Sequence, residues 1–162
     1  MNQIQIRELL QFYEKQLFEQ VMPFWLERAI DQEYGGFYTC FTNDGKALLS
    51  KDKYVWSQGR FIWVLSKLAE LSGDPMYLRL AKPGVEFLEK YCRLPNGNCV
   101  FLLSREGMPK EPVPGRGYDT SIYVDCFVII GFAKYAAISG DLRPLESALQ
   151  VYDSVINRVQ RK

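Results

Sequence analysis

The sequence predicts an all-α protein built from helical hairpins, with short β-hairpin pieces in the loops. Apolar residues recur with the 3.6-residue period of a helix over most of the chain. The period is interrupted at two similar places, LSGDPMYLRLA at 71–81 and ISGDLRPLESA at 138–148, which align with an offset of 67 residues. Self-similarity at a fixed period is typical of stacked helical hairpins.

The first predicted helix has apolar residues at helical spacing from Ile6 to Met22. Pro23 has no backbone N–H, so we expect it to end or kink this helix. The period then changes in GGFYTCF, TNDG and KALLS. These segments predict a short β-hairpin, because Asn43-Asp44-Gly45 supplies the residue types of a tight turn.

The second predicted helix covers about residues 54–71 and is apolar on nearly every side, as in an interior helix. We expect it to stop at Ser72-Gly73. Asp74 then caps a third helix, with Pro75 at its first position, that continues to about residue 91. Pro83-Gly84 lies inside this third helix and predicts a kink or a break there.

The second half of the chain repeats this pattern. A strand-like segment, CVFLL, follows PNGN, and a Gly- and Pro-rich loop covers residues 106–117. A fourth helix, apolar on nearly every side, is predicted from about Ile122 to Ser139. Gly140-Asp141 ends it and caps a fifth helix with a polar face. Each repeat is therefore an apolar inner helix followed by an amphipathic outer helix.

The offset of 67 residues also pairs polar and aromatic residues at the starts of the two inner helices. It sets Trp56 against Tyr123 and Gln58 against Asp125. If the repeats superpose, these residues and Arg60 lie near one end of the bundle. The loops that carry residues 34–38 and 116–120 lead into the same helix starts, so we expect a ligand pocket at this end.

Composition excludes several classes of function. Twenty basic and nineteen acidic residues leave a net charge of +1, which does not favour nucleic acid or an anionic membrane as a partner. The N-terminus lacks the apolar core of a signal peptide, and we expect no run of spanning length and a cytoplasmic location. The four cysteines form no CxxC pair and the chain has no histidine, so we expect free thiols, no metal and no cofactor.

Four ordered motifs resemble the opening half of a known family. FW is followed after five residues by DQEYGGFYT, then come a DG turn, KYVWSQGRFIW and SIYVDCFVIIGFAKYAAISGD. This arrangement is similar to the N-acylglucosamine 2-epimerase family, which includes cellobiose 2-epimerases and mannose isomerases. The resemblance implies an α/α barrel of six helical hairpins, of which residues 1–162 would form a single incomplete domain with about the first five helices.

The resemblance also implies an activity, in which an aldose bound in the barrel exchanges a proton at C2 through an enediolate. Arg60 matches the arginine of the family motif WxQGR, which belongs to the active site, and Tyr123 and Asp125 match family residues of the next inner helix. The family takes its acid and base from two histidines of later helices. Because this sequence has none, we expect the chain to be inactive alone.

Arg60 shares a helix face with Trp56 and Trp63, and its guanidinium can donate to adjacent sugar oxygens. The alternative is a structural arginine that pairs with Asp125 or Asp119. The aromatic candidates for stacking on a pyranose could equally be core residues, and the polar candidates for binding hydroxyls could instead cap or bridge helices. The candidate substrate-binding residues are Tyr38, Trp56, Gln58, Tyr123 and Asp125.

Two other functions remain open. Related helical-hairpin barrels host glycosidases with paired carboxylates, for which Asp31, Glu33, Asp119 and Asp125 are candidates, although Asp31 and Glu33 have the setting of solvated loop residues. The chain could also be a non-catalytic helical module that binds a sugar or another protein. In each case an exposed apolar flank predicts self-association or a completing C-terminal chain.

Overall fold

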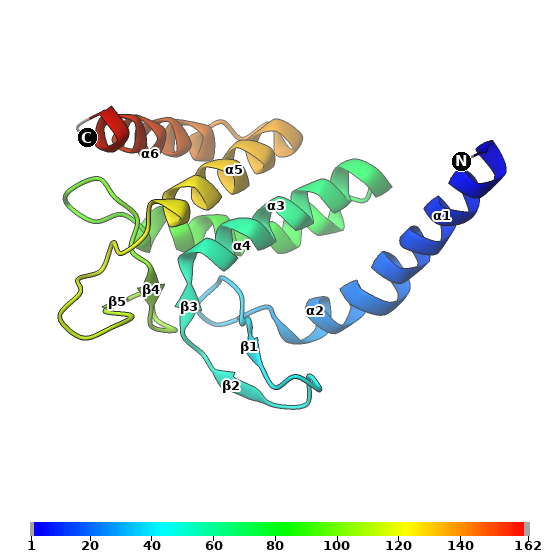
Figure 1. Ribbon diagram of the computed structural model, residues 1–162, viewed down its shortest axis with the longest axis horizontal. Coiled ribbons are helices and arrows are strands. Elements are labelled where there is room, and N and C mark those ends of the chain that lie inside the picture. Colours follow the sequence, from blue (N-terminus) through cyan, green and yellow to red (C-terminus); the bar gives the residue numbers. More distant parts are fainter. Residues whose placement is uncertain (1, 161–162) are drawn as a thin grey trace. The chain divides into compact units, whose positions relative to one another are not determined.

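The computed structural model describes residues 2–160, and the chain divides into two compact units, one up to Ile30 and one from Asp31 onward (Figure 1). The first unit is a continuous helical segment. It consists of α1 (Gln3–Lys15), a π-helix η1 (Gln16–Val21) and α2 (Met22–Arg28).

Pro23 was expected to end or kink the first helix. It does not end the helical segment, because α2 continues through it to Arg28. The Met22 N–H donates to the Leu17 carbonyl, five residues back, which is the wide turn of a π-helix. Pro23 thus falls in the first turn of α2, where a missing N–H costs little.

The second unit begins with the predicted β-hairpin. β1 (Cys40–Phe41) pairs antiparallel with β2 (Leu48–Ser50), and Gly45 in the turn has a φ of 70°. A three-stranded sheet follows, in which β4 (Leu102–Leu103) lies between β3 (Lys53–Tyr54) and β5 (Pro109–Lys110). The strand predicted in CVFLL is confirmed as β4. β5 lies in the segment that we predicted as loop, because two residues are too short a run to show a strand period.

Four helices form the two predicted hairpins: α3 (Val55–Ser72) with α4 (Met76–Tyr91), and α5 (Ile122–Ser139) with α6 (Arg143–Gln160). α5 packs against both α3 and α6, and α4 packs on α3 (Figure 1). Gly73 and Gly140 end α3 and α5 in the left-handed conformation that favours glycine. The helical hairpins and their order are therefore as the repeat predicts.

The predicted break at Pro83 is wrong, since α4 is continuous from Met76 to Tyr91. One face of α4 is buried along its length, including Ala81, Val85 and Leu88. Gly84 lets this face approach the Phe37 ring, because a Cβ there would lie 2.3 Å from that ring. Packing of the apolar face holds the helix together across the proline.

α5 also corrects the expectation that no run approaches a membrane-spanning length. By length and composition alone, Ile122–Ser139 is long and apolar enough to cross a membrane. In the structure Val124, Val128 and Phe132 are buried and the helix packs against α3 and α6. These contacts are those of the core helix of a helical bundle.

Candidate functional site

Two glycines bring the backbones of α3 and α5 into contact. A Cβ on Gly59 would lie 2.4 Å from the Phe127 carbonyl oxygen, and a Cβ on Gly131 would lie 2.4 Å from the Gly59 carbonyl oxygen. No side chain fits between the helices at these points. The glycine of the QGR motif therefore sets the position of the next residue, Arg60, against α5.

Arg60 is exposed beside this crossing. The centre of its guanidinium lies 5.7 Å from the Trp56 ring and 5.3 Å from the Phe127 ring, within the range of cation–π attraction. Within residues 2–160, no carboxylate forms an ion pair with it. Asp125 instead pairs with Arg158, and Asp119 accepts hydrogen bonds from Asn96 and Asn98. The structural pairing of Arg60 with Asp125 or Asp119 is therefore wrong.

The repeat places Gln58 and Asp125 at equivalent positions, and both side chains form hydrogen bonds to the backbone of a preceding segment. The Gln58 amide accepts from the Phe37 N–H at 2.7 Å and donates to the Phe37 carbonyl at 2.8 Å. Asp125 accepts from the Cys99 N–H at 2.8 Å and from Arg158 at 2.8 Å. Both side chains are fully buried. Each holds the extended segment that precedes its inner helix, which is the bridging role that we gave as the alternative.

The predicted aromatic residues differ in exposure. Tyr123, at the start of α5, is 72% exposed, and Trp56 is half-buried. Trp63 is exposed although it lies one turn further along α3. Tyr38 is buried and its hydroxyl hydrogen-bonds to Asp31. Trp56 and Tyr123 are thus open to a ligand, and Tyr38 faces a polar cluster inside the unit.

That polar cluster, the Asp31 cluster, consists of Asp31, Glu33, Lys53 and Arg105. Asp31 accepts from Lys53 at 2.9 Å and from two nitrogens of Arg105 at 3.0 Å each. Arg105 also pairs with Glu33 at 2.8 Å, and Lys53 donates to the carbonyls of Gly35 and Arg105. The side chains of Asp31 and Lys53 are fully buried, so the expectation of a solvated Asp31 is wrong.

The cluster is electrostatically self-consistent. Burial alone would raise the pKa of the Asp31 carboxyl, but the hydrogen bonds from Arg105 and Lys53 outweigh it and hold that pKa well below its usual range. Burial lowers the pKa of Lys53, and its bond to Asp31 opposes this shift. Burial and the bond to Asp31 raise the pKa of Tyr38 to about 12. The cluster joins the segment before β1, strand β3 and the loop between β4 and β5.

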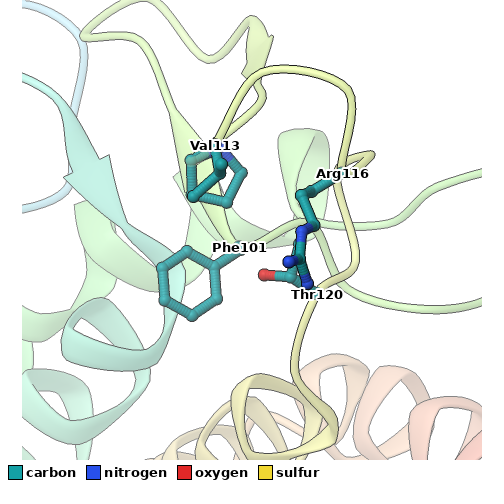
Figure 2. A pocket seen from close by; sticks show the side chains of 5 residues that line it. Phe101, Val113, Arg116 and Thr120 are labelled. Atoms are coloured by element: carbon teal, nitrogen blue, oxygen red, sulfur yellow. The ribbon is translucent and has the colours of Figure 1, made fainter.

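A pocket of about 330 Å³ lies between Phe101 and the loop that joins β5 to α5 (Figure 2). Its walls are Phe101, Pro112, Val113, Arg116 and Thr120. A second cavity of about 430 Å³ lies where α5 begins, and it is lined by Asn98, Asp119, Thr120, Ser121, Ile122, Arg158 and Val159. Arg60 and the five candidate substrate-binding residues line neither of these two cavities, although both lie at the predicted end of the bundle. Of the candidate glycosidase carboxylates, Asp119 lines the second cavity.

A row of three rings connects Arg60 with the first pocket. The Trp56 and Tyr54 ring centroids lie 6.4 Å apart, and those of Tyr54 and Phe101 lie 5.9 Å apart. Arg60 stands over the Trp56 end, and Phe101 lines the pocket at the other end. Sequence reasoning missed Tyr54 and Phe101, because only the pairing of β3 with β4 brings them together.

Two stacked helical hairpins, with an apolar inner helix and an amphipathic outer helix in each, are the repeating unit from which helical-hairpin barrels are built. The family model for N-acylglucosamine 2-epimerase (GlcNAc 2-epimerase) matches residues 36–162. The chain belongs to this family, as the motifs predict.

Curated relatives agree with this assignment. The N-acylglucosamine 2-epimerase of Mus musculus is 33% identical over 162 residues, which cover 95% of this chain and 37% of the relative. The cellobiose 2-epimerase of Bacteroides fragilis is 26% identical over 91% of this chain and 36% of the relative. The chain thus spans a little over a third of the length of these relatives.

Solved structures confirm the fold. A sugar epimerase from a ruminal bacterium superposes with a TM-score of 0.80 at 26% identity, covering 90% of this chain and 36% of that one. A D-mannose isomerase has a TM-score of 0.72 at 23% identity, covering 88% and 34%. The fold is therefore of the α/α-barrel type.

Proposed function

We propose that this chain supplies the arginine-bearing part of the sugar site of an aldose 2-epimerase. The observation that carries the proposal is the setting of Arg60, which is exposed, has no carboxylate partner among residues 2–160, and lies over two rings at the α3–α5 crossing. The family, whose characterised relatives are named for N-acylglucosamine and cellobiose, supports a sugar as the ligand.

Arg60 suits one part of the chemistry of C2 epimerisation. Removal of the proton next to a carbonyl places negative charge on the carbonyl oxygen, and a fixed cation with several N–H donors stabilises that charge. The guanidinium lies over the Trp56 and Phe127 rings, which attract a cation without neutralising its charge. Trp56 and the exposed Tyr123 are the candidates for contacts with the apolar face of the sugar.

We further propose that the chain alone does not epimerise an aldose, because it has no suitable base. The sequence contains no histidine. The buried amine of Lys53 donates to Asp31 and to two carbonyls, and Asp31 is held as a carboxylate by its cationic partners. Neither group is free to take a proton from C2.

Hydrogen exchange at C2 tests this step. The chain is incubated in D₂O with N-acetylglucosamine, mannose or cellobiose, and the C2 proton is followed by NMR. We expect no loss of that proton beyond a protein-free blank. Steady deuterium uptake that disappears in Arg60→Ala would contradict the proposal, because it would show that the chain contains its own base.

A glycosidase is disfavoured by the state of the acidic residues. A glycosidase acid needs a raised pKa, whereas hydrogen bonds from Asn98 and Asn96 lower the pKa of Asp119. The pKa of Asp31 is also lowered, because its bonds to Arg105 and Lys53 outweigh its burial. The Asp125 carboxylate is buried and bonded to Arg158. A non-catalytic sugar-binding module is the second candidate, and the absence of histidine favours it.

We also propose that one flank of the second unit is covered, either by self-association or by a completing chain. Apolar side chains on α5 and α6 are exposed there: Tyr123, Ile130, Leu149, Tyr152 and Val159. The repeat equates Trp56 and Trp63 on α3, whose helix contacts α5, with Tyr123 and Ile130 on α5. α5 therefore exposes the face that corresponds to the face with which α3 contacts α5.

A further inference from the structure

Two of the cysteines form a buried pair of free thiols at the end of α4. Cys92 is the C-cap of that helix, and Cys99 lies on the segment that turns back toward it. Both side chains are buried, and their thiols are hydrogen-bonded to one another. Cys40 and Cys126 are only half-buried. The pair therefore differs from the other two cysteines in both burial and contact.

The backbone of residues 92–100 brings these two thiols together. Arg93 and Cys99 are partners in an antiparallel bridge, and the Val100 N–H donates to the Cys92 carbonyl at 2.8 Å. Gly97 closes the turn between them with a φ of 86°. Partners across such a bridge have Cα atoms about 4.5–5.5 Å apart, and a disulfide spans about 4.4–6.8 Å. The two arms of the turn thus already approach as closely as a disulfide requires.

This turn also holds the next helical hairpin. The Cys99 N–H donates to the Asp125 carboxylate at 2.8 Å. The neighbouring Asn98 side chain donates to Asp119 at 2.6 Å and accepts from the Ser154 hydroxyl at 2.9 Å. The turn therefore connects the end of α4 with the start of α5 and with α6. A covalent bond at its base would fasten α4 to the segment that positions α5.

The surroundings of the pair keep it reduced while the turn is closed. The hydrogen bond to Cys92 and burial both raise the pKa of the Cys99 thiol, and the Asp125 carboxylate raises it further. Because the thiolate is the form that attacks an oxidant, a protonated and buried Cys99 reacts slowly. Oxidation therefore requires a small oxidant, such as hydrogen peroxide, that enters the turn or reaches it during a brief local opening.

We propose that Cys92 and Cys99 are a redox modification site, at which a peroxide converts the two thiols into an intramolecular disulfide. One sulfur loses its proton and attacks a peroxide oxygen, the O–O bond breaks, and a sulfenic acid and one water result. The other sulfur then attacks the sulfenic sulfur, the S–S bond forms, and the S–O bond breaks to release a second water. Two electrons pass from the thiols to the peroxide. The proposal does not depend on a sugar at Arg60.

Peptide mapping of the full chain tests the proposal. The reduced protein is treated with one equivalent of hydrogen peroxide, the remaining thiols are alkylated in denaturant, and the chain is digested with trypsin. Trypsin cleaves after Arg93, between the two cysteines, so the disulfide joins peptides 91–93 and 94–105. We expect this joined species, lighter by two hydrogen atoms than the two free peptides, as the main oxidation product.

Urea unfolding of the same samples measures the effect on the fold. The short loop that the bond closes should raise the urea midpoint by about 1 M relative to the reduced chain, and a reductant should reverse this shift. Cys92→Ala and Cys99→Ala should each lose the shift. The double variant Cys40→Ala/Cys126→Ala is the matched control and should keep both the joined peptides and the shift.

Three results of the mapping would overturn the site: recovery of both thiols in alkylated form, separate sulfinic acids at the two positions, or a disulfide from either cysteine to Cys40 or Cys126. Each of these is read on the unmodified chain, so the test stands even where an alanine variant fails to fold. Joined peptides with an unchanged or lower urea midpoint would contradict the fastening of α4 by this bond.

Discussion

Replacing Asp31 by Asn should strongly destabilise the second unit. The Asp31 carboxylate accepts from Lys53, from two nitrogens of Arg105 and from the backbone N–H groups of Glu33 and Tyr34, at 2.9 to 3.2 Å. An amide presents its own N–H groups to these donors and leaves the buried Lys53 ammonium without its counter-charge. Removing one partner of a buried pair costs about 3–5 kcal/mol, a large part of a typical unfolding free energy of about 5–15 kcal/mol.

Urea unfolding followed by circular dichroism measures this loss. Asp44→Asn in the exposed turn between β1 and β2 is the matched control, because the same chemical change there strands no buried charge. The double variant Asp31→Asn/Lys53→Met should lose less than the sum of the two single variants, since the stranded ammonium is gone. An Asp31→Asn loss as small as that of Asp44→Asn, or strictly additive losses, would refute the reasoning.

Three further predictions concern Asp31, Gly59 and Gln58. Because the pKa of Asp31 is lowered in the folded state, the unfolded state binds this proton more readily. The Asp31 carboxylate should therefore stabilise the fold above about pH 4 and lose this contribution in more acidic solution. Urea unfolding at several acidic pH values should show this loss in the unmodified chain and not in Asp31→Asn. Gly59→Ala should lower the unfolding free energy by about 1–3 kcal/mol or more through its contact with α5, whereas the exposed Ala137→Ser should not; equal urea midpoints would contradict this. Gln58→Ala should lower the unfolding free energy by about 1–3 kcal/mol for each Phe37 backbone group that it leaves unpaired. Gln150→Ala on the surface of α6 should lower it much less, and thermal melts of the two variants test this difference.

Sedimentation velocity tests the proposed coverage of the α5–α6 flank. We expect an assembly larger than one chain, since Tyr123 and Tyr152 are exposed on neighbouring helices together with other apolar residues. Tyr123→Ser should shift the distribution toward the monomer. A monodisperse monomer of the unmodified chain across a wide concentration range would contradict self-association.

Local signals in the sequence were sufficient for the helical hairpins. Gly73 and Gly140 adopt the left-handed conformation at the predicted helix ends. Asp74 accepts the Met76 N–H at 2.8 Å at the start of α4, whose N-cap position is Pro75. Pro23 and Pro83 misled the prediction, because a π-turn and the packing of a buried helix face overrode the local preference of proline. Local rules fail where a neighbouring turn or a tertiary contact compensates.

The site was less predictable than the fold, because its contacts join distant parts of the chain. Asp31 and Arg105 are 74 residues apart in sequence, and nothing near Asp31 indicates a buried carboxylate. Likewise, Phe101 joins the aromatic row only through the pairing of β4 with β3. Arg60 could be singled out, since it is a cation on a helix that is otherwise apolar on nearly every side.

Titration of the ¹⁵N-labelled chain with N-acetylglucosamine, glucose and mannose tests the central claim, that Arg60 belongs to a sugar site. For at least one of these sugars, we predict saturable shifts for residues around Trp56 and Phe127, which are lost in Arg60→Gln and retained in Arg79→Gln. If Arg60→Gln binds every sugar as the unmodified chain does, or if the shifts appear away from the α3–α5 crossing, the assignment of Arg60 to a sugar site is wrong.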